Sequence, residues 1–271
     1  MKRYWAVAVV RMTWLAGFLV ATCSIQAAEG DVFRMETDLF VAGRTEPIAE
    51  YLTLFSERTV YDFRVSKPEE IAVFDWDRNR IILIDPSRQW RSVLTTDDVL
   101  QFTAAIKTHV KPENAIFYAA THPQFESLEN AKPESDSKFT LKSGPIEYRI
   151  QGAAPRHASS VRRYQEFADW SARLSAMRPG NLPPFIRIEV NQTIAQRGWL
   201  PEEVVRVVDP GKFGKKKLEV QARHLVNWIL SETDRKRIER VGNQMVSFKE
   251  VPFAEFRDAV AAESTDKTAK R

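Results

Sequence analysis

The chain has 271 residues, of which 44% are hydrophobic and 28% charged, and its formal net charge is +4. Three of its 40 basic residues, Lys2, Arg3 and Arg11, lie in the first 27 residues, which contain no acidic residue, so the remainder carries 37 basic against 36 acidic residues. This near-neutral balance gives no long-range electrostatic steering of a polyanion, and we expect no nucleic-acid partner. A chain of this length can bury one large core or two modest ones.

The N-terminal segment has the order of a secretory signal peptide. Its basic residues precede an apolar stretch at positions 12–20, and small residues follow up to Ala27 and Ala28. The apolar stretch is too short for a transmembrane helix, which needs about 20 residues to cross the hydrocarbon core. We therefore predict a signal peptide at residues 1–27, cleavage after Ala27 and an exported protein, periplasmic or extracellular.

The only cysteine, Cys23, follows Val20, Ala21 and Thr22, an order similar to the lipobox of bacterial lipoproteins. Thr22 departs from the Gly, Ala or Ser that a lipobox has before its cysteine. Ordinary cleavage after Ala27 is therefore favoured, and a lipoprotein anchored through Cys23 is the alternative. Neither alternative leaves two cysteines that could form a disulfide, so stability must come from the core.

Apolar and polar residues alternate from Asp31 onward, which predicts six successive strands. In the first of them Phe33, Met35 and Leu39 alternate with charged residues, so one face is apolar. Short turn clusters separate the runs, and neighbouring strands are expected to pair as an antiparallel meander. The predicted strands are residues 31–41, 48–55, 59–65, 71–76, 80–85 and 90–94.

A helix is predicted over residues 95–110, capped by Thr95 or Thr96. Its apolar positions, which include Phe102, recur at helical spacing, so we expect this stripe to pack on the sheet. Residues 111–137 are predicted to be irregular, and their last part, 126–137, is rich in polar residues and typical of a surface loop.

The second half is predicted to add further helices and strands to the same domain. The predicted strands are residues 138–142, 146–151, 185–190, 203–208 and 217–228, and the predicted helices are 159–177, a short one ending at Gly198, 231–241 and 253–262. The charged residues 263–271 are expected to form a disordered tail.

Three oxygen-bearing residues at alternate positions, Asp75, Asp77 and Asn79, match the start of a calcium-binding loop. The match ends there, because Arg80 occupies the position that requires glycine and Pro86 the position that requires a bidentate carboxylate. A turn between two strands accounts for these residues better. We predict no metal ion and no cofactor.

The four histidines, His109, His122, His157 and His224, have no metal-binding spacing. His224 alternates with its neighbours in a predicted strand and is expected in a partly buried, hydrogen-bonded position. His122, in a turn before Pro123, is the histidine most worth examining for chemistry. For an acidic catalytic site, the candidates are Asp62, Asp75 and Asp85, which lie near strand ends.

A basic loop around Phe213, Lys215, Lys216 and Lys217 separates the last two predicted strands. Such a hairpin tip is suited to peripheral contact with anionic headgroups or cell-wall polymer, each lysine being worth roughly 1 kcal/mol near an anionic surface. The alternative is a charged turn that keeps a sheet edge soluble.

Large aromatic residues are frequent, and most of them must be core. Where some line the concave face of the first sheet, they would form a cleft for an acyl chain or another apolar ligand. The candidate pocket residues are Trp76, Trp90, Phe74 and Phe102.

The segment from Phe33 to Val110 contains the runs Leu52-Thr53-Leu54-Phe55 and Ile81-Ile82-Leu83-Ile84-Asp85-Pro86. In pattern it resembles the half-barrel of periplasmic lipoprotein carriers and their lipid-binding relatives, the LolA-like group. The resemblance implies a lipid-lined cavity and no enzymatic activity. The chain departs from those carriers in lacking their leading helix and in adding more than a hundred residues after the first helix, so no family residue is carried over.

We therefore predict an α+β fold with a curved, half-barrel-like antiparallel sheet packed by helices. Residues 28–150 form the sheet and its helix, and residues 151–262 continue the same domain. The leading hypothesis for function is a non-enzymatic carrier of an apolar or lipid-like ligand. The alternatives are an envelope-associated hydrolase with an acidic or histidine site, and a structural interaction module of the cell envelope.

Overall fold

The computed structural model describes residues 32–126, 137–211 and 216–269, and the predicted signal peptide with Cys23 lies outside them. Eleven strands form one sheet within these residues. The strands are β1 (Phe33–Val41), β2 (Ala49–Ser56), β3 (Thr59–Arg64), β4 (Glu70–Asp75), β5 (Arg80–Asp85), β6 (Trp90–Thr95), β7 (Lys138–Ser143), β8 (Ile146–Ala153), β9 (Leu200–Val208), β10 (Leu218–Asn227) and β11 (Lys249–Glu250).

The sheet runs in the order β11-β6-β5-β4-β3-β2-β1-β10-β9-β8-β7, and it is antiparallel except for the short pair β11 and β6. The six predicted strands of the first half form a meander from β1 to β6. The second half joins it where β1 pairs with β10, with Met35 opposite Val226 and Thr37 opposite His224. The predicted α+β fold with one curved antiparallel sheet is confirmed.

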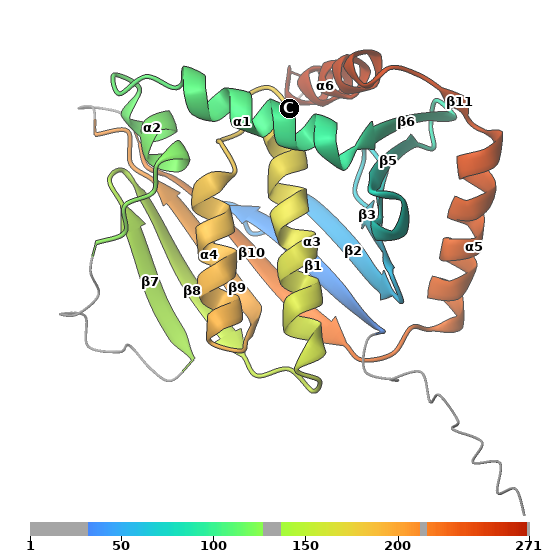
Figure 1. Ribbon diagram of the computed structural model, residues 1–271, viewed down its shortest axis with the longest axis horizontal. Helices are drawn as coiled ribbons and strands as arrows, with labels where there is room; N and C mark the ends of the chain where they lie inside the picture. Colours follow the sequence, from blue (N-terminus) through green and yellow to red (C-terminus); the bar gives the residue numbers. More distant parts are fainter. Residues whose placement is uncertain (1–31, 127–136, 212–215, 270–271) are drawn as a thin grey trace, which may run out of the picture.

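Six α-helices surround the sheet among the described residues (Figure 1). They are α1 (Thr96–His109), α2 (Ala115–Thr121), α3 (Ser159–Ala176), α4 (Phe185–Gln196), α5 (Glu232–Ser247) and α6 (Phe253–Ala269). Helices α3 and α4 lie side by side across one face of the sheet, which we call the inner face. Helix α5 covers strands at the other end of the sheet, and α1 crosses the upper ends of α3 and α4.

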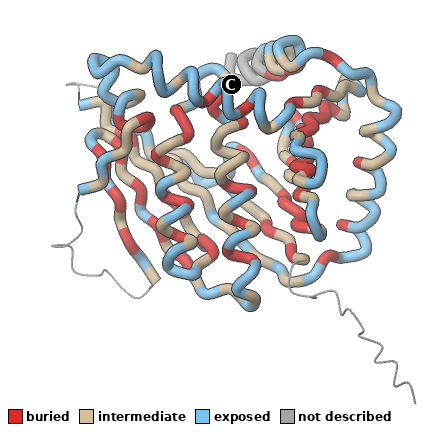
Figure 2. The backbone as a smooth tube through the Cα atoms, viewed as in Figure 1, coloured by how far each residue is buried: buried red, intermediate tan, exposed pale blue. Residues whose placement is uncertain are grey.

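Three apolar clusters stabilise this arrangement, and buried residues are concentrated where helices meet the sheet (Figure 2). Phe33, Phe55 and Phe74 on the inner face pack against α3. A second inner-face cluster, beneath α2 and α4, contains Ile146 and Ile186. The third lies on the outer face, where α5 covers β2 to β5. Strands β2 to β5 are therefore buried on both faces.

Two segments between the first and last predicted helices have a secondary structure that differs from the prediction. Residues 185–190, predicted as a strand, form the first half of α4, because Ile186, Val190 and Ile194 recur every four residues and are all buried. The β-branched residues favoured the strand interpretation. In the segment predicted to be irregular, Asn114 caps the short helix α2 by accepting a hydrogen bond from the backbone N–H of Phe117.

Helix α1 begins as predicted, with Thr95 and Asp98 in a capping box, but it does not lay its stripe on the sheet. Only Val99 and Thr103 are buried, whereas Phe102 is exposed, since α3 and α4 occupy the inner face. Helix α6 continues to Ala269, beyond the predicted end at Ala262, so most of the expected tail has helical backbone. Most of the predicted surface loop lies outside the described residues.

Candidate ligand-binding cavity

A cavity of about 550 Å³ lies between the inner face of the sheet and the helix layer. Its floor is formed by strands β1 to β4 and β8 to β10, and its roof by α3, the loop after α3 and the first turn of α4. The size is within the range of about 300–1,000 Å³ that is usual for small-molecule sites. The apolar part of the lining includes Met35, Leu39, Phe74, Phe167, Leu174, Val204 and Val220.

Along α3, the cavity is lined by a stripe of small side chains. Ala168, Ser171, Ala172 and Ser175 recur at spacings of three and four residues, so they lie on one helix face, and all four line the cavity. Larger residues would fill the space between helix and sheet at the density usual for protein interiors. The small stripe leaves that space open.

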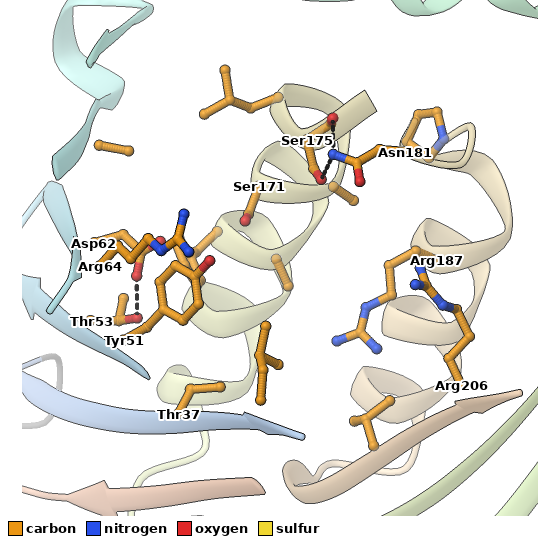
Figure 3. A pocket seen from close by; sticks show the side chains of 18 of the residues that line it. Thr37, Tyr51, Thr53, Asp62, Arg64, Ser171, Ser175, Asn181, Arg187 and Arg206 are labelled. Carbon is orange, nitrogen blue, oxygen red and sulfur yellow. Dashed lines mark hydrogen bonds between the residues drawn. The ribbon is translucent and has the colours of Figure 1, made fainter. Parts of the chain in front are cut away.

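One group of polar residues in the cavity is balanced in charge, and we call it the balanced cluster: Tyr51, Asp62, Arg64, Glu70 and Arg178. Thr53 donates a hydrogen bond of 2.8 Å from Oγ1 to Asp62 (Figure 3). Glu70 is buried and accepts a hydrogen bond from the guanidinium of Arg178. Although burial opposes it, the carboxylate of Glu70 raises the pKa of Arg178. Two cations thus face two carboxyl groups.

Within the balanced cluster, burial raises the pKa of the Asp62 carboxyl to about 6. The hydrogen bond from Thr53 opposes this effect, and the nearby charge of Glu70 adds to it. The exposed area of Asp62 is intermediate because its side chain borders the cavity, which lies inside the protein. Asp62 therefore ionises close to neutral pH, and the charge of this cluster depends on pH.

A second polar group is formed by Arg187, in the first turn of α4, and Arg206, on β9; we call it the arginine pair. Both side chains extend into the space between α4 and the sheet, and both line the cavity (Figure 3). Nε of Arg206 is buried and has no hydrogen-bond partner. Tyr164 lies close to Arg187, which counteracts the rise that burial causes in the pKa of the tyrosine.

His224 borders the arginine pair and is a neutral imidazole over the physiological pH range. Burial, reinforced by the charge of Arg187, lowers the pKa of His224 to about 3. Its Nδ1 lies 2.9 Å from Oγ1 of Thr37, and its Nε2 is buried without a hydrogen-bond partner. The partly buried, hydrogen-bonded position is the one that the strand alternation predicts for His224.

Of the four predicted pocket residues, only Phe74 lines the cavity. Trp76 packs on Phe74 and Trp170, with ring centroids 5.6 and 6.1 Å apart, and Trp90 packs against the same inner-face core. Phe102 lies on α1 and is 37% exposed. Trp76 and Trp90 therefore pack in the core beside the cavity, and many of the residues that line the cavity are polar.

The acidic candidates do not come together. Asp75, the last residue of β4, lies opposite the start of β5 and accepts hydrogen bonds from Arg78 and Arg80. Asp85, at the other end of β5, accepts hydrogen bonds from Ser87 and Arg88 in the β5–β6 turn. The two ends of this strand are about 17 Å apart at about 3.3 Å per residue. Asp62 alone of the three lines the cavity.

No group of three or more His, Cys, Asp or Glu side chains arranged to hold a metal ion occurs among residues 32–126, 137–211 and 216–269. At the calcium-like sequence, Asp77 pairs with Arg58, and Asn79 adopts a left-handed turn conformation. The residues thus form a hairpin turn with satisfied charges. His122 stacks on Tyr118 at 4.7 Å and is not part of the cavity.

At the basic loop, Lys217 pairs with Asp209 at 3.1 Å, and both side chains are solvent-accessible. Lys216 is exposed, and Phe213 and Lys215 lie outside the described residues. The described part of the loop is thus a charged hairpin base that does not line the cavity.

Sequence reasoning missed most of the polar cavity residues, among them Arg64, Glu70, Arg178, Arg187 and Arg206. The available signal is a charged residue at an inward position of an alternating strand, as at Asp62 and Arg64 on β3. No protein-family model matches the chain, and no curated protein matches its sequence.

Proposed function

We propose that this protein is a non-enzymatic binding or carrier protein for a lipid-like small molecule. The observation that carries the proposal is the cavity between the sheet and α3, which has the size of a small-molecule site and combines an apolar lining with a few convergent polar groups. The stripe of small residues on α3 supports it further, because that stripe keeps the space open at the cost of core packing.

We also propose that the protein is exported and related to the LolA-like carriers. The order of the N-terminal residues supports export, and the curved sheet with helices on its inner face agrees with the architecture that the resemblance implies. Among the described helices, none is both long and apolar enough to cross a bilayer.

The test is binding of a neutral apolar dye, N-phenyl-1-naphthylamine, whose fluorescence rises on transfer from water to an apolar site. We expect the protein to bind the dye at one site and Ser171→Trp, which fills the cavity from α3, to weaken binding at least tenfold. Native mass spectrometry of the purified protein should also detect a co-purifying small molecule that Ser171→Trp lacks.

Glu166→Trp is the matched control, because it adds the same side chain to an exposed position of the same helix. It should leave dye binding within twofold of the original protein. Equal dye binding by the original protein and Ser171→Trp would place the dye elsewhere and remove the support for a cavity ligand.

A further inference from the structure

The arginine pair places two positive charges in the cavity, and the fold does not require charged residues at these positions. Arg187 comes from α4 and Arg206 from β9, so two separate elements each place a cation in the lining of the same cavity (Figure 3). Like charges that share a partly desolvated space repel each other, and the repulsion is screened less there than at the surface.

No carboxylate of the described residues lies within 4.0 Å of either guanidinium. Arg187 interacts electrostatically with Asp169, but that carboxylate accepts a hydrogen bond of 2.8 Å from Asn191 and does not line the cavity. The balanced cluster provides the contrast, because there Arg178 has Glu70 as its partner. Inside the same cavity, Arg178 has a carboxylate partner, whereas Arg187 and Arg206 have none within 4.0 Å.

The start of α4 adds further positive charge near the arginine pair. Its N-cap, Pro184, provides no side-chain hydrogen bond, and Pro183, Pro184 and Arg187 line the cavity. The N-terminal end of a helix carries partial positive charge and favours anions, so a cation in the first turn is unfavourable there. A negatively charged group would relieve both effects at once.

Neutral hydrogen-bonding groups lie beside the pair. Tyr164 is adjacent to Arg187, and His224 keeps Nε2 buried without a partner. In the tautomer whose Nδ1 accepts from the Thr37 hydroxyl, Nε2 carries the proton and is a donor. Guanidinium groups bind carboxylate and phosphate through paired N–H donors, and these additional donors suit the same acceptors.

We propose that the cavity binds an acidic amphiphile with a single alkyl chain, whose carboxylate or phosphate lies between Arg187 and Arg206. The alkyl chain lies along the apolar lining provided by Leu39, Val204 and Val220. This inference rests on the proposed function and adds the charge and the shape of the ligand. Carboxylate and phosphate share the chemistry that the pair recognises, so the experiment separates them.

Calorimetric titration with four soluble probes tests the inference: decanoate, decyl phosphate, decanol and inorganic phosphate. We expect at least one of the two acidic amphiphiles to bind at least tenfold more tightly than decanol, and inorganic phosphate to bind much more weakly than decyl phosphate. The tighter of decanoate and decyl phosphate identifies the preferred head group.

Arg187→Gln and Arg206→Gln should each reduce binding of the acidic amphiphiles at least tenfold while changing binding of decanol less than twofold. Arg149→Gln is the control, because Arg149 lies on β8 opposite Val205, the neighbour of Arg206, but pairs with Glu219 and does not line the cavity. Since each cavity variant removes a repelled charge, we expect its unfolding temperature without ligand to be unchanged or higher.

Decanol binding as tightly as both acidic amphiphiles would overturn this inference and leave the proposed function standing. Inorganic phosphate binding as tightly as decyl phosphate would show a simple anion site and would also overturn it. Absence of binding by all three decyl compounds, together with no dye binding, would overturn the proposed function itself.

Discussion

Glu70, at the start of β4, and Arg178, two residues after the end of α3, form a largely buried ion pair across 108 residues of sequence. This ion pair connects the loop after α3, in the roof of the cavity, to the sheet that forms its floor. Removing one partner leaves the other charge without compensation, which is more costly than losing an exposed pair.

We therefore expect Glu70→Gln to lower the free energy of unfolding by about 2–4 kcal/mol. Urea denaturation followed by tryptophan fluorescence measures the change. Glu250→Gln is the matched control, since Glu250 pairs with Arg91 at 2.9 Å but is 57% exposed, and its loss should cost less than about 1 kcal/mol. Equal effects of the two variants would contradict a structural role for the buried pair.

Phe55 is central to the inner-face core, because it stacks on Phe33 at 4.0 Å and meets Phe167 edge to face at 5.5 Å. Phe55→Ala should destabilise the protein by about 3–5 kcal/mol, since the cavity that it creates is closed by sheet and helix. Phe102→Ala, at an exposed position on α1, should change stability by less than about 0.5 kcal/mol. A comparison of thermal unfolding midpoints distinguishes the two, and a similar loss for both would mean that α1 packs as the sequence predicts.

Asp62→Asn should stabilise the protein at pH 7 and have little effect at pH 4. The pKa of Asp62 is about 6 in the folded protein against 3.8 for an unperturbed carboxyl, so the folded state binds more protons between these values and loses stability as pH rises through them. The gain at pH 7 is expected to be about 1–3 kcal/mol. The ionisable groups that face Asp62 in the cavity are Tyr51, Arg64, Glu70 and Arg178.

Denaturant titrations at pH 4, 5, 6 and 7 follow this change for both proteins. A stability difference that is the same at all four values would show that the variant acts through packing and not through the titration of Asp62.

His224→Gln should reduce the loss of stability on acidification. The folded pKa of about 3 lies below the ordinary 6.5, so only the unfolded chain takes up a proton between these values, and stability falls as pH drops through the window. At pH 5 the variant should recover about 1–2 kcal/mol of this loss, because Gln retains a partner for Thr37 without titrating. Identical pH profiles of the two proteins, measured by urea unfolding, would disprove the buried neutral state of His224.

The first half of the fold follows from the sequence more directly than the second half. Alternation identifies β1 to β6, since turns are short and each strand pairs with its neighbour in sequence. It cannot reveal the partner of β1 in the second half, because β10 lies far along the chain and its pairing depends on the whole tertiary structure. At α4, the β-branched residues around Ile186 outweighed the four-residue spacing that the structure follows.

The cavity was harder to predict than the sheet. On β3, Phe63 and Asp62 are neighbours that face opposite sides, and both sides of this strand are covered, so the pattern gives no indication of which side contains an open space. The ligand prediction placed large aromatics in the pocket, whereas the open space follows the small residues of α3, such as Ala168 and Ala172. Small side chains are also common in helices for other reasons, so their meaning emerges only when the opposite wall is known.

The pairing of β1 with β10 has a consequence for biosynthesis. Thr37 and His224 are in register although 187 residues separate them, so one edge of β1 stays unpaired until most of the chain has left the ribosome. An unpaired edge is a template for association with other chains. The nascent protein therefore depends on completing its C-terminal third before it can protect its N-terminal strands.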